Sequence, residues 1–282
     1  MKPISPRRSS IISVLDVGTS KVVCLIARLD PVSESDLLRG RTHRAQIIGI
    51  GHQRARGLKA GAVVDLEAAE MSIRQAVDAA ERMARVEIRS VIVSMTGGRL
   101  GSRSFSAEIG LRGESVSAAD LNRAFAKASI DSMMPQRSVL HALETGFTLD
   151  DVRGIREPLG MLGRKLGVDM HVVTSDEYAV RNLMLAVERC HLEVEAVVAG
   201  PYASGLSVLV DDEAEMGVAV VDFGAGTTSV GVFAGGALVH TDAVAVGGNH
   251  ITMDIARGFT TTLTHAERLK TLFGSTMASA SD

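Results

Sequence analysis

The chain has 282 residues, a net charge of −3 and 46% hydrophobic residues, enough for one large domain or two ordinary ones. The near-neutral charge argues against a nucleic-acid-binding protein, because such proteins normally carry a basic face. Aromatic residues make up only 3% of the chain, so stacking surfaces for bases or sugars are scarce.

The first 95 residues follow an α/β pattern of strands, a helix and a further strand. Expected strands occupy residues 11–15, 21–29, 45–51 and 88–95. Asp65 is expected to cap a helix from Leu66 to about Arg85, whose apolar residues share one face. The polar stretch 30–44 is expected to be a loop.

The sequence pattern changes near Thr96, where a glycine-rich stretch begins. The pattern Ser117-x-x-Asp120 resembles a capping box and predicts a helix to about Ile130. Weaker strand patterns cover residues 102–109, 137–142 and 165–173. We therefore expect a small α+β domain over residues 95–174, called the insert below, within the first domain.

Helices and strands alternate again after the insert. Ser175 is expected to cap a helix, which is followed by a strand at 194–198 and a helix at 201–209. Strands at 218–221, 229–233 and 237–246 predict a meander.

Two more helices are expected near the end of the chain. Asn249 is expected to cap the first, which runs through Ile255. A capping box, Thr264-x-x-Glu267, is expected to open the second, which ends near Gly274. The low-complexity tail 275–282 is expected to be disordered.

Neither a signal peptide nor a membrane span is predicted. Asp16 interrupts the apolar run Ile11–Leu15, which is too short for a signal sequence. No run reaches the ~18 apolar residues of a spanning helix. Cys24 and Cys190 read as small buried residues in a reducing compartment. These features predict a cytoplasmic protein.

Two turns in the sequence share one residue pattern. The first turn, Asp16-Val-Gly-Thr-Ser, and the second turn, Asp222-Phe-Gly-Ala-Gly-Thr-Thr, each join two strands. Neither leads into a helix, so neither is a P-loop or a dinucleotide fingerprint. One such turn is usually a plain hairpin. A pair of them suggests a clamp that grips a polyphosphate from opposite sides, with two related lobes around it.

The residue types of these turns suit a magnesium–phosphate ligand. Asp16 and Asp222 are candidates to hold Mg²⁺ through water, although each could instead be an ordinary turn aspartate. Glycines of the second turn are expected to take positive φ and present N–H groups. Candidate phosphate contacts are Gly18, Thr19, Ser20, Gly224, Gly226, Thr227 and Thr228. Lys21 faces either phosphate or solvent, and Gly247 and Gly248 form either a plain turn or a close approach to ribose or phosphate.

Several stretches resemble a known family. The first and second turns are similar to the two phosphate loops of the superfamily of actin, heat-shock chaperones and hexokinase. The blocks DVGTSKVVCLIA, RGLKAGAVVDLEA, AVERCHLEVEAVVAGPYASGLSVLVDDEAEMGV and GGALVHTDAVAVGGNHITMDIARG resemble the bacterial cell-division family FtsA. The likeness runs from Ile11 to about Gly274.

The resemblance implies an α/β fold of actin-like (ribonuclease H-like) lobes. Residues 1–94 and 175–204 would form the first lobe, 95–174 the inserted subdomain, and 205–282 the start of an incomplete second lobe. ATP and Mg²⁺ would be the cofactors, with weak or no ATPase activity. The spacing Glu267-x-x-Lys270 matches a superfamily pair that grips adenosine, although a capping role for Glu267 remains open.

The resemblance also implies a scaffold role in cell division. Members of the family polymerise, dock the FtsZ ring, recruit later division proteins, and reach the cytoplasmic face of the inner membrane at the septum through a C-terminal helix. The FtsZ-docking part and the membrane helix are not expected within these residues, so the chain resembles a truncated form. Ser229 stands where the family pattern commonly has Asp.

Other functions that the same fold supports stay open. A sugar or acyl kinase would need a catalytic carboxylate or base across the cleft, and the segment from Pro201 to Ser204 offers no persuasive one. A pilus-assembly relative of actin is a further alternative. The insert disfavours a heat-shock chaperone, whose lobes differ at that place.

Overall fold

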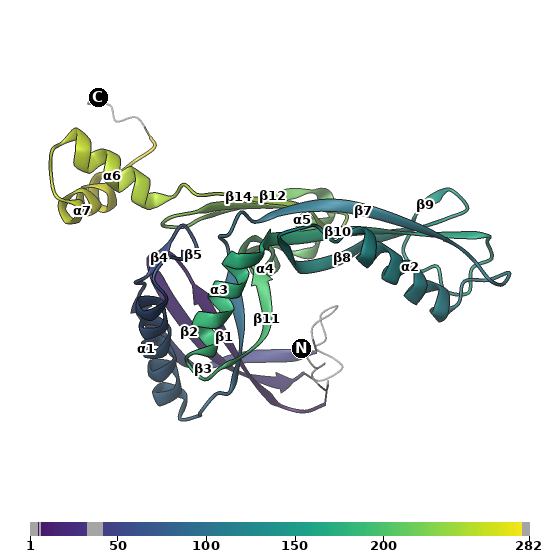
Figure 1. Cartoon of the computed structure of the whole chain (residues 1–282), viewed down its shortest axis with the longest axis horizontal. Helices are drawn as coiled ribbons and strands as arrows, with labels where there is room; N and C mark the ends of the chain where they lie inside the picture. The colour runs from purple at the N-terminus through teal and green to yellow at the C-terminus, as the bar shows by residue number, and fades with distance from the viewer. Residues whose placement is uncertain (1–4, 6, 33–41, 278–282) are drawn as a thin grey trace.

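The chain folds around two sheets that meet at an angle, with two short helices projecting at one end (Figure 1). The structure, a computed structural model, describes residues 5, 7–32 and 42–277. The predicted loop 30–44 and the predicted disordered tail 275–282 fall partly outside these residues. Within them, the ends of the predicted loop belong to strands that run to Pro31 and start at His43.

The first sheet has five strands in the order β11-β6-β1-β2-β3. Their bounds are β1 Ser10–Val17, β2 Lys21–Pro31, β3 His43–Arg54, β6 Ser90–Met95 and β11 Glu193–Ala199. The first three form an antiparallel meander, and β6 and β11 then add in parallel. This parallel register places Ser94 beside Asp16.

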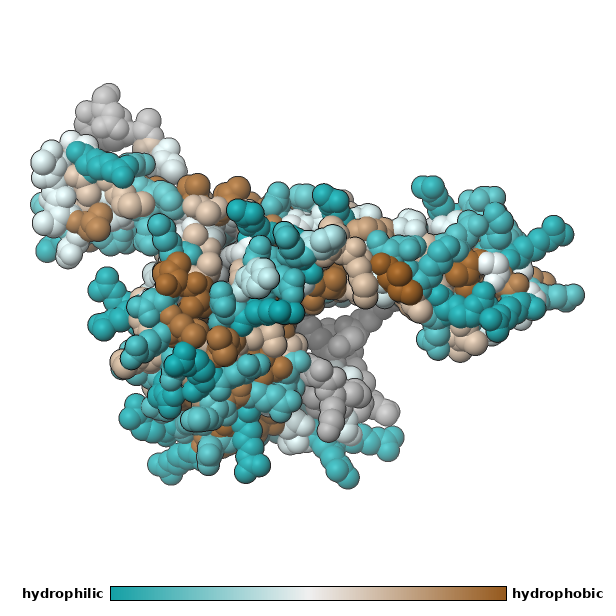
Figure 2. Space-filling view, viewed as in Figure 1, coloured by the Kyte–Doolittle hydropathy of each residue, from teal (hydrophilic) through white to brown (hydrophobic). Residues whose placement is uncertain are grey.

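Two helices, α1 (Leu66–Ala84) and α3 (Glu177–Glu188), cover one face of this sheet and share its core. Backbone contact explains two glycines of β3, because a Cβ at Gly49 or Gly51 would collide with carbonyls of α1. In Figure 2, hydrophobic side chains gather in the strip between α1 and α3, while hydrophilic ones predominate over the lower end of this lobe.

The second sheet has seven strands in the order β12-β13-β14-β7-β10-β8-β9. Their bounds are β7 Gly101–Gly110, β8 Arg137–Leu149, β9 Val152–Ile155, β10 Lys165–Asp176, β12 Val218–Phe223, β13 Thr228–Ala234 and β14 Ala237–Val244. The strands β12, β13 and β14 are the predicted meander, and the other four belong to the insert. A single residue pair, Asp242 with Gly101, joins the two groups.

The predicted helix of the insert, α2 (Ala118–Asp131), packs on β7 and β10 and begins with the expected capping box at Ser117 and Asp120. The Asp65 cap of α1 is also confirmed, since its side chain accepts the Ala68 N–H. The mixed α/β class predicted from the sequence is confirmed.

Three other predicted caps are wrong. Asp176 caps α3, while Ser175 is buried in β10 and donates to the Gly98 carbonyl at 2.8 Å. The helix α6 (Gly248–Gly258) begins one residue before Asn249, with Gly247 as its cap. The helix α7 (Leu263–Phe273) is capped by Thr262 rather than Thr264, so Glu267 has no capping role.

A short two-strand ribbon and two short helices complete the fold. A two-strand ribbon, β4 (Leu58–Lys59) and β5 (Ala62–Val63), follows β3. The helix α4 (Gly200–Val208) matches the predicted helix to within a residue. The acidic helix α5 (Asp211–Met216) was not predicted, because it is a single short segment with no apolar stripe.

Candidate functional site

The first and second turns have the same backbone hydrogen bond. The Gly18 N–H donates to the Lys21 carbonyl at 3.0 Å, and the Gly224 N–H donates to the Thr227 carbonyl at 2.9 Å. In each turn the aspartate lies two residues before this glycine, on the last strand pairs of a hairpin. The two hairpins are therefore local copies of one structure, contributed by different sheets.

Glycine is needed in these turns for a reason that the sequence did not indicate. Gly224 and Gly226 do not adopt the positive φ that was expected of the second turn, and Gly18 and Ala225 do not have it either. A Cβ would instead crowd the closing carbonyl, at 3.1 Å in the first turn and 2.9 Å in the second. Close approach of the backbone, rather than positive φ, is the constraint.

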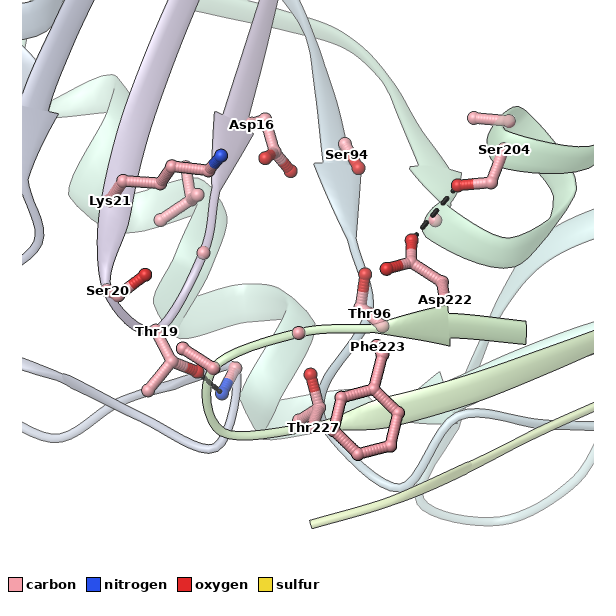
Figure 3. Close-up of a pocket in the computed structure, with 17 residues that line it drawn as sticks. Asp16, Thr19, Ser20, Lys21, Ser94, Thr96, Ser204, Asp222, Phe223 and Thr227 are labelled. Carbon is pink, nitrogen blue, oxygen red and sulfur yellow. Dashed lines mark hydrogen bonds between the residues drawn. The ribbon is translucent and has the colours of Figure 1, made fainter. Parts of the chain in front are cut away.

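The two turns touch each other. A Cβ on the buried Gly226 would lie 2.7 Å from Thr19 Cγ2. The Thr19 hydroxyl is itself held, because it accepts the Gly61 N–H at 3.1 Å (Figure 3). Thr19 thus fits between the second turn and the β4–β5 ribbon, and the turns close one end of a shared space.

That space is a cavity of about 520 Å³, called the two-turn cavity below. Both turns line it, together with the end of β6 and the first part of α4. Its lining residues are Asp16, Val17, Gly18, Thr19, Ser20, Lys21, Gly61, Ser94, Thr96, Gly200, Ala203, Ser204, Asp222, Phe223, Gly224, Ala225 and Thr227. Two loops about two hundred residues apart in sequence therefore face one hollow (Figure 3).

Two carboxylates face this cavity. Burial raises the pKa of Asp16, and the negative charge of Asp222 raises it further, while the Ser94 hydroxyl and the Lys21 ammonium oppose the rise. Asp222 accepts a hydrogen bond from the Ser204 hydroxyl at 3.0 Å. Figure 3 shows Lys21 extending towards Asp16, with Ser94 between the two acids. Partly buried like charges of this kind favour a cation between them.

A direct all-protein metal site is not present in the described part of the chain, where no three metal-ligating side chains cluster. The two-turn cavity, of about 520 Å³, has room for a hydrated ion. Mg²⁺ commonly keeps several waters and uses one or two carboxylates together with substrate phosphates.

Gly247 and Gly248 approach the second turn instead of the cavity. The N–H groups of Gly248 and Asn249 donate to the carbonyls of Gly224 and Ala225 at 3.0 and 2.8 Å. A Cβ on Gly247 would collide with the Gly224 carbonyl. The close approach is therefore to the protein backbone, and the start of α6 supports the second turn from behind.

The pair Glu267 and Lys270 lies beside this support, outside the lining of the cavity. Lys270 Nζ donates to Glu267 at 2.7 Å, to the Thr252 hydroxyl at 2.9 Å and to the Gly248 carbonyl at 3.2 Å. The hydrogen bond from Lys270, aided by Thr252, lowers the pKa of Glu267. Thr228 is also outside the lining, since its hydroxyl donates to the Val246 carbonyl at 2.7 Å.

Three lining hydroxyls were missed by sequence reasoning, those of Ser94, Thr96 and Ser204. Ser94 was recoverable in principle, because a strand parallel to β1 ends at the same edge of the sheet as Asp16. Ser204 lies on a helix whose placement depends on tertiary packing, and no local signal identifies it.

No helix among the described residues combines the length and the hydropathy that crossing a membrane would require.

Both family matches fall on segments that contribute strands to the second sheet. Residues 97–174 match the SHS2 domain inserted in FtsA, and residues 219–282 match the cell division protein FtsA. The first match covers the insert except for its first two residues, and the second contains the second turn and α6–α7.

Curated relatives named cell division protein FtsA match over nearly the whole chain. The protein of Agrobacterium fabrum is 54% identical over 282 residues, which is 100% of this chain and 64% of the relative. That of Rhizobium meliloti is 53% identical over the same span. That of Escherichia coli K12 is 33% identical over 265 residues, covering 94% of this chain and 61% of the relative. The chain thus spans just under two thirds of the length of these relatives.

Among solved structures, a PilM–PilN type IV pilus biogenesis complex contains a chain with the same fold. The TM-score is 0.64 at 18% identity, over 93% of this chain and 70% of the other. The predicted actin-like fold with an inserted subdomain is confirmed. With two FtsA family models matching residues 97–174 and 219–282, and relatives named cell division protein FtsA aligned along its length, this chain belongs to the FtsA family of cell division proteins.

Proposed function

We propose that the two-turn cavity binds MgATP and that the protein is an actin-like scaffold of the cell-division machinery. The observation that carries this proposal is the pair of matching turns facing one cavity of about 520 Å³. A cavity with two acids, one lysine and several backbone N–H groups and hydroxyls suits a charged polar ligand better than an apolar one.

The triphosphate would lie between the turns. Gly18, Ser20 and Lys21 would contact it from the first turn, and Gly224 and Thr227 from the second. Thr19 and Gly226 would act mainly by closing the turns on each other. Neither Gly247 nor Thr228 needs to touch the ligand, because each supports the second turn.

Mg²⁺ would be held through water by Asp16 and Asp222. The raised pKa of Asp16 reflects burial and the nearby Asp222, and a divalent cation would relieve both costs. When bound, the ion would neutralise phosphate charge. The protein's own contribution is to position the acids: Ser204 donates to Asp222, and Ser94 lies beside Asp16.

The adenosine end would extend past the second turn towards Glu267 and Lys270. Lys270 lies within hydrogen-bonding distance of the Gly248 carbonyl, directly behind the turn. Both side chains already bond each other, so a ribose or base would have to compete with Thr252 for them.

The cellular role follows from family membership. We assign residues 1–94 and 175–204 to the first lobe, 95–174 to the insert and 205–282 to the second lobe. The protein would polymerise and serve as a link between the FtsZ ring, later division proteins and the cytoplasmic face of the inner membrane, with weak or no ATP turnover. The family's FtsZ-docking and membrane-binding parts would lie in the portion of the relatives that this chain does not span.

Titration calorimetry with MgATP tests the proposal. The unaltered chain is expected to bind, and Asp222→Asn is expected to weaken binding by roughly tenfold or more, as loss of a charged contact of about 1.5–3 kcal/mol implies. Asp254→Asn is the matched control, because Asp254 is an exposed acid on α6 and lies outside the cavity lining.

Equal affinities for the Asp222→Asn and Asp254→Asn variants would contradict the clamp. Rapid transfer of phosphate from ATP to a small metabolite would contradict the scaffold role and favour a kinase. The lining of the cavity argues against that outcome, because among the described residues its carboxylates are Asp16 and Asp222, both assigned here to the ion.

A further inference from the structure

The helix α4 connects the two-turn cavity to the insert. On its cavity side, Gly200, Ala203 and Ser204 form part of the lining. Ser204 donates to Asp222 at 3.0 Å, so the position of α4 sets the position of one of the two acids (Figure 3). Gly200 packs against Thr96 so closely that a Cβ would collide with the Thr96 hydroxyl.

The start of α4 is held by a histidine of the insert. Ala199 ends β11 and is the cap residue of α4, but its side chain makes no capping hydrogen bond. Its N–H donates to His141 Nε2 at 2.9 Å. His141 lies on β8, 58 residues away in sequence.

This bond defines the state of the imidazole. Because Nε2 accepts, the ring is neutral and its proton is on Nδ1. Burial lowers the pKa of His141, which keeps the ring in this neutral state. A protonated ring would present a donor to the Ala199 N–H and lose the bond.

A row of three rings extends the contact from the insert through α4 to β13, with the first pair tilted and the second stacked. The His141 and Tyr202 ring centroids are 4.8 Å apart, and those of Tyr202 and Phe233 are 6.5 Å apart with nearly parallel planes. Gly205 of α4 sits on the Phe233 ring, where a Cβ would collide with it. The helix is therefore fixed between the insert on one side and the meander on the other.

We propose that His141 is a positioning residue that couples the insert to the two-turn cavity. The proposal rests on nucleotide binding in that cavity, as proposed above. A displacement of the insert, such as a binding partner would cause, moves His141, the Ala199 N–H and the first turn of α4 together. The Ser204–Asp222 hydrogen bond then changes, and with it the affinity for MgATP. Linkage requires the reverse effect as well: ligand in the cavity changes the insert's affinity for a partner.

Two substitutions separate the hydrogen bond from the packing. His141→Gln keeps an acceptor near the position of Nε2 but loses the aromatic ring. His141→Phe keeps the ring against Tyr202 but has no acceptor. The expected result is that His141→Phe weakens MgATP binding roughly 5- to 20-fold, at the lower end of typical couplings, and that His141→Gln restores most of it.

Hydrogen exchange gives a second measure that needs no nucleotide. Without ligand, His141→Phe is expected to speed amide exchange over residues 199–204, and His141→Gln is expected to leave it near the original rate. His171→Phe is the matched control: His171 is buried on the neighbouring strand β10, and its Nε2 has no hydrogen-bond partner among the described residues. It should not change exchange over 199–204.

The outcomes are distinguishable. If the unaltered chain binds no MgATP but exchange over 199–204 responds as expected, the nucleotide proposal fails while the His141 contact to α4 stands without a function. If the chain binds MgATP and His141→Phe matches it in both affinity and exchange, the coupling is overturned and the nucleotide proposal survives. Equal weakening by His141→Phe and His141→Gln, with equal loss of melting temperature, would reduce His141 to a packing residue and also overturn the coupling.

Discussion

The Thr19 side chain lies against the backbone of Gly226, so the two turns meet at a residue that cannot carry a Cβ. Thr19 cannot simply rotate away, because its hydroxyl accepts the Gly61 N–H at 3.1 Å. Gly226→Ala is therefore expected to push the turns apart, with a loss of about 1–3 kcal/mol in stability and weaker MgATP binding. Thermal melting and calorimetry measure the two effects. Gly113→Ala, at a site with no neighbour within 4 Å, should change neither.

Asp16 is expected to lower the stability of the unliganded protein at neutral pH. Its pKa is raised in the fold above the ordinary value of 3.8, chiefly by burial, so the folded state binds the proton more tightly than the unfolded state does. The penalty for ionisation is absent below the unfolded pKa and grows as pH rises through the raised folded pKa. Asp16→Asn should therefore melt at a higher temperature at pH 7 and bind MgATP more weakly.

Melting curves across pH check this expectation. The difference between Asp16→Asn and the unaltered chain should shrink as pH falls towards 3.8. A lower melting temperature for Asp16→Asn at pH 7 would show instead that the carboxylate stabilises the fold.

Ser229 offers a substitution that should stabilise the protein. Its side chain is 2% exposed, and its hydroxyl has no hydrogen-bond partner among the described residues. An unpaired buried polar group costs about 1–3 kcal/mol, so Ser229→Ala is expected to raise the melting temperature. Ser175→Ala is the matched control: that hydroxyl is equally buried but donates to Gly98 at 2.8 Å, and its loss should destabilise. A destabilising Ser229→Ala would mean that water or ligand pairs with this hydroxyl.

The Glu267–Lys270 pair is expected to hold α7 against α6. Because hydrogen bonds from Lys270 and Thr252 lower the pKa of Glu267, the ionised side chain stabilises the fold above its ordinary pKa of 4.5. This stabilisation is lost as pH falls through the lowered pKa of the folded state. Glu267→Gln should speed amide exchange in α7 at pH 7. Asp254→Asn breaks the looser pair with Arg257, 3.9 Å apart and exposed, and should leave exchange unchanged.

Both cysteines should be unreactive while the protein is folded. Burial raises the pKa of Cys24 to about 12 and that of Cys190 to about 11, so almost no thiolate forms near neutrality. Iodoacetamide at pH 8 should label neither in the native protein and both in denaturant, as counted by mass spectrometry. Rapid native labelling of Cys24 would contradict its position in the core.

Local sequence signals predicted helix caps correctly where the hydrogen-bond partner of the cap is close in sequence. Asp65 and Ser117 cap helices as expected, because the partner of each cap lies within three residues. Asn249 failed as a cap for the opposite reason. The first N–H groups of α6 bond carbonyls of the second turn, more than twenty residues earlier, and this moves the start of the helix to Gly248.

The candidate site was predictable in its acids and turns but not in its hydroxyls. Asp16 and Asp222 carry a repeated pattern, which a single sequence can reveal. Ser204 reaches the cavity only because α4 packs on Phe233 through Gly205, and that contact has no local signature. The positive φ expected for the glycines of the second turn was wrong, because a Cβ would crowd the Thr227 carbonyl at Gly224 and the Thr19 side chain at Gly226, and this crowding requires the same residue type.

The strand β12 has a practical consequence for work with this chain. Among the described residues it pairs with β13 alone, and Val221 and Phe223, which share one face of the strand, are 62% and 65% exposed. An unpaired edge strand with exposed apolar side chains promotes nonspecific aggregation, which is distinct from ordered polymerisation. Turbidity or pelleting at high concentration will therefore detect this aggregation as well as filaments. Only the part of the signal that depends on nucleotide is evidence for a cytoskeletal polymer.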